Sequence, residues 1–357
     1  MSDTHDLWWD RIPSAAGFIS RTAGTLENHS CVISLPENVP WYDSMYEKLA
    51  EEVSSSDRTI KRISDEGGDP GRQIMESFCR SETRNAYRSS IGYAKFLAAN
   101  DKQSEMTGCC TVITNISAER ITEWAKFVNE YEKNHKPGAP KCIFLLEYRS
   151  DTQLHNSIPL PVLRWEENIK VYDSFMYALL EVSMLNCPGE FKEYLAEIIS
   201  SVSGSDVELA SELAKHGKAC AVKLSEIISE INENSLRSTG ELFNISLDSE
   251  QIRSVVWAAQ IKIIFPVIER FRNTLLKSLM KYFESDFRFE TVYGDVKTDP
   301  RDLELGEIVY LSSISKISLT QTQLANATFF RNCRNTLAHF DTLSPENVEK
   351  ALCLNVK

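Results

Sequence analysis

The chain contains short, almost uninterrupted apolar runs that alternate with segments of helical periodicity. Residues 141–148, KCIFLLEY, form the clearest run, and residues 31–35 and 109–113 are similar. Strands this apolar are typical of parallel sheets that are covered on both faces. Between them, residues 41–53 and 117–131 repeat apolar residues at helical spacing. This order of strand, helix and strand predicts an α/β domain with a parallel sheet.

The remainder of the first two-thirds of the chain is less regular. Residues 160–165 and 169–172 are shorter strand candidates, and a helix is expected over residues 73–100. From Ser174 onward, Pro and Gly residues separate segments with 3.6-residue periodicity, which predicts a helical segment up to residue 247.

The last part of the chain has the pattern of long helices. Residues 249–283 are rich in apolar side chains, which predicts a buried helix with a kink at Pro266. A second long helix is predicted from Ser318 or Thr320 to about Ala338, and a short closing helix over residues 345–352. We therefore expect an all-α domain at this end.

The distribution of charge also divides the chain. There are 39 basic and 51 acidic residues, a net charge of −12, but residues 248–357 contain 14 of each. The acidic surplus therefore lies in residues 1–247, and an anionic surface does not bind nucleic acid or an acidic membrane by bulk charge. We predict three parts: residues 1–173, 174–247 and 248–357.

The cysteines and the N-terminal residues indicate the cellular compartment. The nine cysteines are odd in number, form no CxxC pair and lie partly inside apolar runs. This pattern predicts buried, reduced thiols rather than disulfides or a zinc site. No basic stretch followed by an apolar core opens the sequence, so no signal peptide is expected. The apolar runs fall short of the roughly 18 residues of a membrane helix. We expect a cytoplasmic protein without membrane contact.

A strand, a loop, a helix and a later strand ending in an acid form the plan of a P-loop nucleotide-binding domain. Phosphate binding there needs glycine N–H groups, a Lys and a Ser or Thr. Residues 35–41 instead read LPENVPW, and neither GxxxxGKS nor GxxxxGKT occurs in the chain. Element order over residues 15–240 resembles an AAA+ or STAND module that has lost its phosphate loop, which implies a sensor or partner-binding domain. Glu147 is either the metal-binding or catalytic acid of that plan or an acid at a strand's solvent end.

The predicted helix over residues 318–338 carries the most specific motif, RNCRNTLAH. Arg334 is followed directly by Asn335 and, after four intervening residues, by His339. This resembles the R-x(4–6)-H motif of the HEPN superfamily, whose commonest form has a polar residue such as Asn after the Arg. The helical layout of residues 248–357 also matches that family. The resemblance implies a metal-independent endoribonuclease, built from two such domains in a homodimer or larger even oligomer.

The residue types are suited to RNA cleavage without metal. A histidine with a pKa near 6.5 exchanges protons in both directions, and a guanidinium stabilises charge on a phosphate. The resemblance implies that Arg334 holds phosphate, His339 is the acid and base, and Asn335 supports them. Residues five apart on an ideal helix point about 140° from each other. Arg334 and His339 therefore converge only if the helix ends between them or if a second chain supplies one of them.

Three further arginines could add a local phosphate-binding patch: Arg331, Arg270 and Arg272. Solvated or ion-paired arginines are the alternative at these positions, and Arg334 itself could pair with an acid such as Glu269. A histidine near a helix C-terminus is also stabilised by the helix dipole without any catalytic role.

The preferred hypothesis is an HEPN-type ribonuclease restrained by the first domain, as in bacterial antiviral or toxin systems. Local RNA contact, no metal and no cofactor are expected. The alternative is a non-catalytic interaction subunit, in which the HEPN-like domain dimerises or docks a partner and the acidic domain binds a basic or protein ligand. A third hypothesis, a nucleotide-responsive switch, places the nucleotide at residues 36–41.

Overall fold

The computed structural model describes residues 6–54, 58–100, 105–136, 140–150, 158–284, 286–291 and 294–354. The chain divides into two compact units, Met1–Asp173 and Ser174–Lys357. The expected third part, residues 174–247, belongs to the same unit as residues 248–357.

The first unit is built on a parallel sheet of five strands in the order β2-β3-β4-β1-β5. The strands are β1 (Cys31–Leu35), β2 (Thr59–Ser64), β3 (Cys109–Ile116), β4 (Ile143–Arg149) and β5 (Val162–Arg164). β1 lies between β4 and β5, and its residue Ile33 is in register with Glu147. Every residue of β1 is buried, as its apolar sequence predicts.

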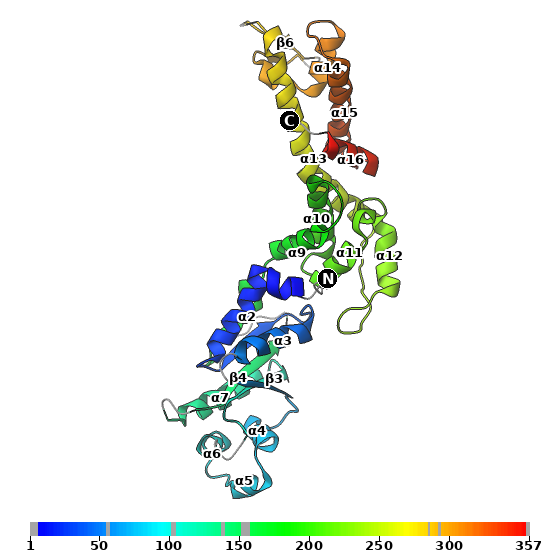
Figure 1. The fold of residues 1–357 in the computed structure, drawn as a ribbon. Coiled ribbons are helices and arrows are strands. Elements are labelled where there is room, and N and C mark those ends of the chain that lie inside the picture. Colours follow the sequence, from blue (N-terminus) through cyan, green and yellow to red (C-terminus); the bar gives the residue numbers. More distant parts are fainter. Residues whose placement is uncertain are drawn as a thin grey trace. The chain divides into compact units, whose positions relative to one another are not determined.

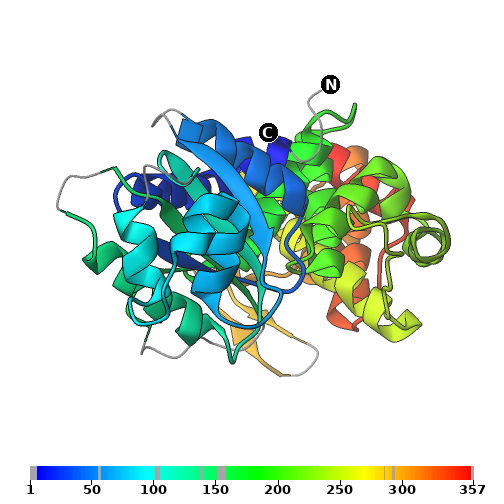
Figure 2. The ribbon, with the colours of Figure 1, turned by 90° about the horizontal axis from the view of Figure 1, so that it is seen from below.

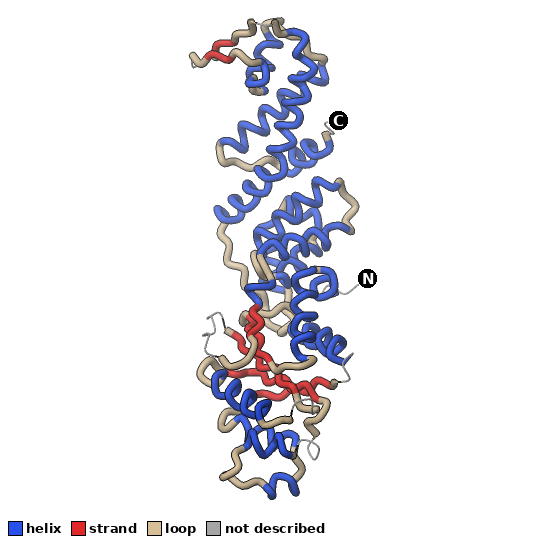
Figure 3. The backbone as a smooth tube through the Cα atoms, turned by 90° about the vertical axis from the view of Figure 1, so that its left-hand side faces the viewer, coloured by secondary structure: helices blue, strands red, loops and turns tan. Residues whose placement is uncertain are grey.

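Helices lie on both sides of this sheet (Figures 1 and 3). They are α2 (Pro13–Leu26), α3 (Tyr42–Ser54), α4 (Pro70–Phe78), α5 (Ser81–Ala86), α6 (Tyr93–Ala99), α7 (Ile121–Lys133) and α8 (Trp165–Asn168), preceded by the helical turn η1 (Leu7–Arg11). One core layer joins Trp124 and Val128 of α7 to Phe144 and Leu146 of β4. α4 and α6 complete this layer.

One strand of this unit was missed, and two expectations for it are wrong. β2 was not predicted, because its sequence TIKRIS alternates with charges and its side chains are only partly buried, as on the edge of a sheet. The expected helix over residues 73–100 is three short helices, with Gly92 at a φ of 79° before α6. The strand candidate at residues 169–172 runs into helix α9 (Val171–Ser183), where Asp173 accepts a hydrogen bond from the Lys170 N–H at 2.7 Å.

The second unit is almost entirely helical, as Figure 2 shows for residues coloured green to red. Its elements are α10 (Gly189–Ser203), α11 (Val207–Lys215), η3 (Gly217–Ala221), α12 (Leu224–Asn234), α13 (Ser249–Leu279), η4 (Met280–Tyr282), β6 (Phe289–Glu290), β7 (Val296–Lys297), η5 (Pro300–Asp302), α14 (Leu305–Ser313), α15 (Gln321–Ala338) and α16 (Pro345–Cys353). The antiparallel β6–β7 hairpin corrects the expectation of a purely α-helical end.

α13 is the central helix of this unit. Asp248 and Gln251 close a capping box at its start, and the helix continues through Pro266. Its buried Gln260 accepts a hydrogen bond from the Leu343 N–H at 2.7 Å and donates to the Tyr194 hydroxyl at 3.2 Å. Gln260 therefore ties both α10 and the segment after α15 to α13, so the two expected helical parts form one unit.

By length and composition, one helix within the described part of the chain, Ser249–Tyr282, could cross a membrane. Long apolar helices at the core of folded domains meet the same criterion. Ile264, Ile268 and Leu275 of this helix are buried within the unit, but only 28% of its most apolar stretch is buried, so the expectation of a helix buried over most of its surface is wrong. All nine cysteines are free; Cys187 is half-buried, Cys353 is exposed and the other seven are buried.

Candidate functional site

The motif helix α15 lies beside α13, as Figure 1 shows for the described residues. Thr320 and Gln323 close a capping box at its start. Its buried face is formed by Ala327, Phe330, Cys333 and Leu337. Because these positions repeat at intervals of three and four residues, Arg331, Arg334 and Asn335 lie on the flanks of the helix.

These three side chains line a pocket of about 750 Å³ together with α13, α14 and the β6–β7 hairpin. Its apolar wall consists of Ile268, Phe289, Leu305 and Tyr310. The Phe289 and Tyr310 rings have centroids 6.4 Å apart and meet edge to face at 63°. A half-open pocket with an apolar wall and a few polar groups is the usual form of a ligand site.

The charged groups of the pocket differ in how far they are already bound. Lys297 forms an ion pair of 2.7 Å with Glu307, and Glu269 pairs with Arg272 at 2.9 Å. Glu304 lies 3.8 Å from the Arg334 guanidinium, which is a loose contact between half-exposed groups. The lining also includes Glu290, Asp295 and Arg331, so it contains five carboxylates and three cations.

His339 does not line this pocket. It is the C-cap of α15, with an exposed side chain, and its N–H donates to the Asn335 carbonyl at 3.1 Å. The helix therefore extends to the motif histidine rather than ending between it and Arg334. Within one chain the structure brings Arg334 and Asn335 together at the pocket and leaves His339 on another side of the helix end.

The helix end next to His339 is held in an unusual backbone conformation. Phe340 has a φ of 59°, and the Asp341 N–H donates to the Thr336 carbonyl at 3.2 Å, which completes a Schellman-type cap. Glycine is the common residue at such a position. Here the Phe340 ring stacks on Trp257 at 4.8 Å, and the Trp257 indole N–H donates to the Leu337 carbonyl at 2.9 Å. α13 thus fixes the segment that presents His339.

The other arginines expected at the site are separated. Arg331 lines the pocket and its guanidinium reaches the Asn332 side chain at 3.2 Å. Arg270 is exposed on α13 and does not line the pocket. Arg272 pairs with Glu269 and donates to the carbonyls of residues 301 and 303, so it ties α13 to the chain before α14.

In the first unit, the acid noted on the third predicted strand is closed off. Glu147 is 1% exposed; its Oε2 accepts hydrogen bonds from Tyr42 at 2.7 Å and from Tyr46, and its Oε1 accepts one from Arg149 at 2.9 Å. Burial and the Glu147 charge raise the pKa of Tyr42 to about 12 and that of Tyr46 well above its usual value. Both tyrosines belong to α3, the helix that follows the altered loop. Three side chains of the protein therefore bind the carboxylate oxygens that a metal ion would need as ligands.

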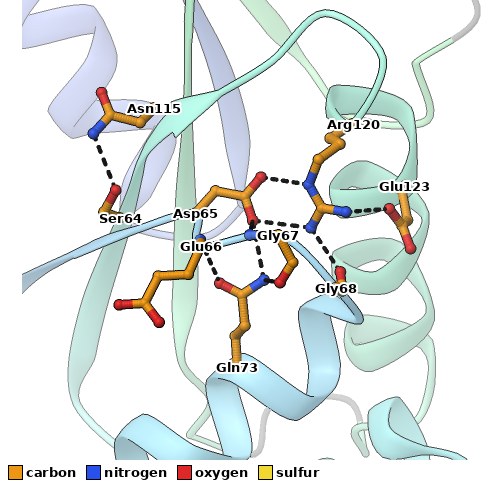
Figure 4. A network of polar contacts seen from close by, with 9 residues as sticks. All are labelled: Ser64, Asp65, Glu66, Gly67, Gly68, Gln73, Asn115, Arg120 and Glu123. Atoms are coloured by element: carbon orange, nitrogen blue, oxygen red, sulfur yellow. Dashed lines mark hydrogen bonds and ion pairs between the residues drawn. The ribbon is translucent and has the colours of Figure 1, made fainter.

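A second acid at the carboxyl end of the sheet, Asp65 after β2, is also bound internally (Figure 4). Arg120 holds it through Nε at 2.5 Å and Nη2 at 2.9 Å, and Gln73 donates to it at 3.0 Å. Burial alone raises the pKa of this carboxyl, but the hydrogen bonds from Arg120 and Gln73 outweigh burial and lower the pKa of Asp65 to about 2. This cluster fixes the loop between β2 and α4.

The sequence signalled only part of these clusters. Tyr42, Tyr46 and Arg149 were not identified as partners of Glu147, because the tyrosines precede it by about a hundred residues. Glu290 and Asp295 were not connected with Arg334, because β7, η5 and α14 lie between them in the chain. Within the described residues, no group of three or more His, Cys, Asp or Glu side chains is placed to hold a metal ion.

No protein-family model and no curated protein matches the chain. One similar solved structure is Drosophila ORC bound to DNA, with 8% identity over 95% of this chain and 85% of that chain and a TM-score of 0.32. Another is the replication initiator DnaA bound to AMPPCP and single-stranded DNA, with 10% identity, coverage of 96% and 94%, and a TM-score of 0.30. At scores this low the likeness supports no conclusion about function.

Proposed function

We propose that the chain is a metal-independent endoribonuclease of HEPN type. The observation that carries the proposal is the placement of Arg334 and Asn335 at the open pocket, with His339 solvent-exposed at the end of the same helix. Arg334 is available to a phosphate because the one ion pair that it forms with a described residue, to Glu304, is 3.8 Å long. Asn335 supports the phosphate, and His339 deprotonates the 2′-hydroxyl and protonates the leaving oxygen.

The same geometry makes one chain an incomplete site. His339 does not reach the pocket that Arg334 lines, so a second copy supplies the histidine in this proposal, as a homodimer or larger even assembly. An isologous dimer gives two equivalent Arg–His pairs, because each surface contacts the other in both senses.

The first unit has a regulatory role in this proposal. Its two acids at the carboxyl end of the sheet are held by the chain's own tyrosines and arginines, which favours a partner-sensing role over nucleotide hydrolysis. Residues 1–173 contain 26 acidic and 20 basic residues, and this acidic surplus suits a basic protein ligand. A system that restrains an RNA-cutting activity until a signal arrives, as in antiviral defence or a toxin pair, is the proposed setting.

A second candidate function is a non-catalytic interaction subunit. It is favoured by the pocket lining, in which five carboxylates outnumber three cations and weaken attraction to phosphate. In this alternative the exposed His339 and Phe340 belong to a docking surface, and neither Arg334 nor His339 affects RNA.

The test is cleavage of total RNA and tRNA in EDTA by wild type, Arg334→Ala and His339→Ala. Arg301→Ala and His216→Ala are matched controls, because both residues belong to the same unit and lie outside the pocket lining. The proposal predicts cleavage by wild type and both controls, and a loss of about 100-fold or more in the two motif variants. Equal cleavage by all five proteins would reject the composite site.

If no protein cuts, expression in cells decides between the two functions. Toxicity that needs both Arg334 and His339 supports a restrained nuclease, whereas a phenotype or partner capture indifferent to both supports the interaction subunit. Light scattering on each variant establishes that assembly is unchanged.

A further inference from the structure

We propose that the pocket beside Arg334 receives an unstacked nucleobase of the RNA and selects bases that carry an amino group. This inference rests on the proposed function, since it assigns the neighbouring part of the same substrate. Single-stranded RNA is commonly recognised through bases that are splayed out, stacked on aromatic rings and bound along their edges.

The apolar part of the pocket lining has the composition that such a base requires. Phe289 of β6 and Tyr310 of α14 present two rings whose centroids are 6.4 Å apart, and Ile268 and Leu305 add further apolar lining. Base stacking on aromatic side chains is tolerant of sequence because every base has a π-face. A volume of about 750 Å³ is within the usual range for small-molecule sites.

The edge of the pocket supplies the means of selection. Glu290 and Asp295 line it from the hairpin, and neither side chain has a hydrogen-bond or ion-pair partner among the described residues. Ionised carboxylates only accept hydrogen bonds. They therefore pair with the exocyclic amino group of adenine, cytosine or guanine and oppose the carbonyl that uracil has at the corresponding position.

The separation of charge within the pocket orients the nucleotide. The cations without a close ion pair, Arg331 and Arg334, are both on α15, where Glu304 contacts Arg334 only loosely at 3.8 Å. Glu290 and Asp295, the carboxylates without a partner among the described residues, are both on the hairpin. A phosphate is attracted to α15 and repelled from the hairpin, so a neutral base enters toward the hairpin while its phosphate stays at Arg334. A purely cationic ligand, such as a polyamine or a basic peptide, is the competing occupant.

The test measures binding of fluorescent 2′-O-methyl hexanucleotides, which cannot be cleaved, to the full chain. We expect adenine and cytosine hexamers to bind about 10-fold more tightly than the uracil hexamer, which is the discrimination of one or two good base contacts. Glu290→Gln combined with Asp295→Asn, whose amides also donate, should reduce the preference to less than about 3-fold. Glu250→Gln, an exposed acid outside the pocket lining, is the control and should keep it.

Cleavage of the matching unmodified RNAs separates this inference from the proposed function. Cleavage that needs His339 but shows no base preference overturns the pocket assignment and keeps the nuclease. Base-selective binding without cleavage under any condition keeps the pocket and rejects the nuclease. Absence of hexamer binding overturns the inference. So does a result in which Glu290→Gln combined with Asp295→Asn abolishes binding of spermidine or an arginine-rich peptide but leaves hexamer binding unchanged.

Discussion

The two units use the same kinds of side chain in opposite ways. At the carboxyl end of the sheet, Glu147 and Asp65 are buried and each is held by an arginine and by neutral donors. In the helical unit, Arg331 and Arg334 face a pocket with their guanidinium groups bound loosely or only to a neutral amide. A satisfied polar cluster fixes a fold, whereas uncommitted charge at a cavity is available to a ligand. The comparison favours the second unit as the place of the proposed chemistry.

The largest expected effect comes from mixing two inactive variants. Arg334→Ala and His339→Ala should each lose about 100-fold or more of RNA cleavage. When they are unfolded together and refolded, about half of the dimers are mixed and each holds one intact pair, so about a quarter of the wild-type rate should return. Recovery is read from the initial rate of tRNA cleavage.

The mixed sample is compared with each variant refolded alone and with wild type refolded in the same way. No recovery despite confirmed heterodimers would show that Arg334 and His339 act within one chain, which would contradict the reading of the exposed histidine.

Glu147→Ala should destabilise the first unit by about 3–5 kcal/mol, because it leaves Tyr42, Tyr46 and Arg149 without their shared acceptor in a buried site. Denaturant unfolding followed by tryptophan fluorescence measures the change. Glu349→Ala, at an exposed ion pair with Lys218 in the second unit, should change stability by less than about 1 kcal/mol. A similar small effect at Glu147 would mean that its cluster is not structural.

Asp65 predicts a dependence of stability on pH. Its pKa falls from 3.8 to about 2 on folding, so its contribution is complete above pH 4 and is lost as the pH falls from about 4 to 2. Asp65→Asn should therefore cost roughly 2 kcal/mol at pH 7, and the difference from wild type should shrink below pH 4. Unfolding curves at several pH values provide the measurement; a gap that is constant down to pH 2 would contradict the assignment.

The smallest effect is expected at the end of the motif helix. Phe340 adopts a φ of 59°, a conformation that is strained for a residue with a Cβ, and its ring contact with Trp257 offsets part of this strain. Phe340→Ala loses the ring and keeps the strain, whereas Phe340→Gly removes both. The glycine variant should be more stable than the alanine variant by about 1 kcal/mol, measured by thermal unfolding. Equal stability of the two variants would remove the strain argument.

The sequence predicted the elements whose residues are uniformly apolar or clearly capped. β1 and α15 lie close to where their patterns place them. The local sequence of Cys31–Leu35 is apolar enough to indicate a buried strand, and Thr320 opens α15 with a capping box. The edge strand β2 was missed because a half-exposed strand alternates with charges like a loop. Residues 169–172 were assigned as a strand because they include β-branched residues, although Asp173 accepts a hydrogen bond from the Lys170 N–H at the start of α9.

The candidate site was predictable only along one helix. The motif identified Arg334, Asn335 and His339, but periodicity alone could not say which of them share a cavity. The composition of the cavity also depends on the hairpin and α14, which supply Glu290 and Tyr310 to its lining. The sequence around these two residues gives no indication of a site. Likewise, Glu147 at the end of an apolar strand is compatible with a metal ligand or a structural acid until the partners from α3 are known.

The most direct test of the central claim compares two variants of the Glu147 cluster with one variant of the motif histidine in a single cleavage assay. Glu147→Gln, Tyr42→Phe and His339→Ala are assayed on tRNA in EDTA, with rates expressed per folded molecule. The account predicts that Tyr42→Phe and the folded fraction of Glu147→Gln keep the wild-type rate, while His339→Ala loses about 100-fold or more. Cleavage that depends on Glu147 and is indifferent to His339 would contradict it and move the chemistry to the sheet.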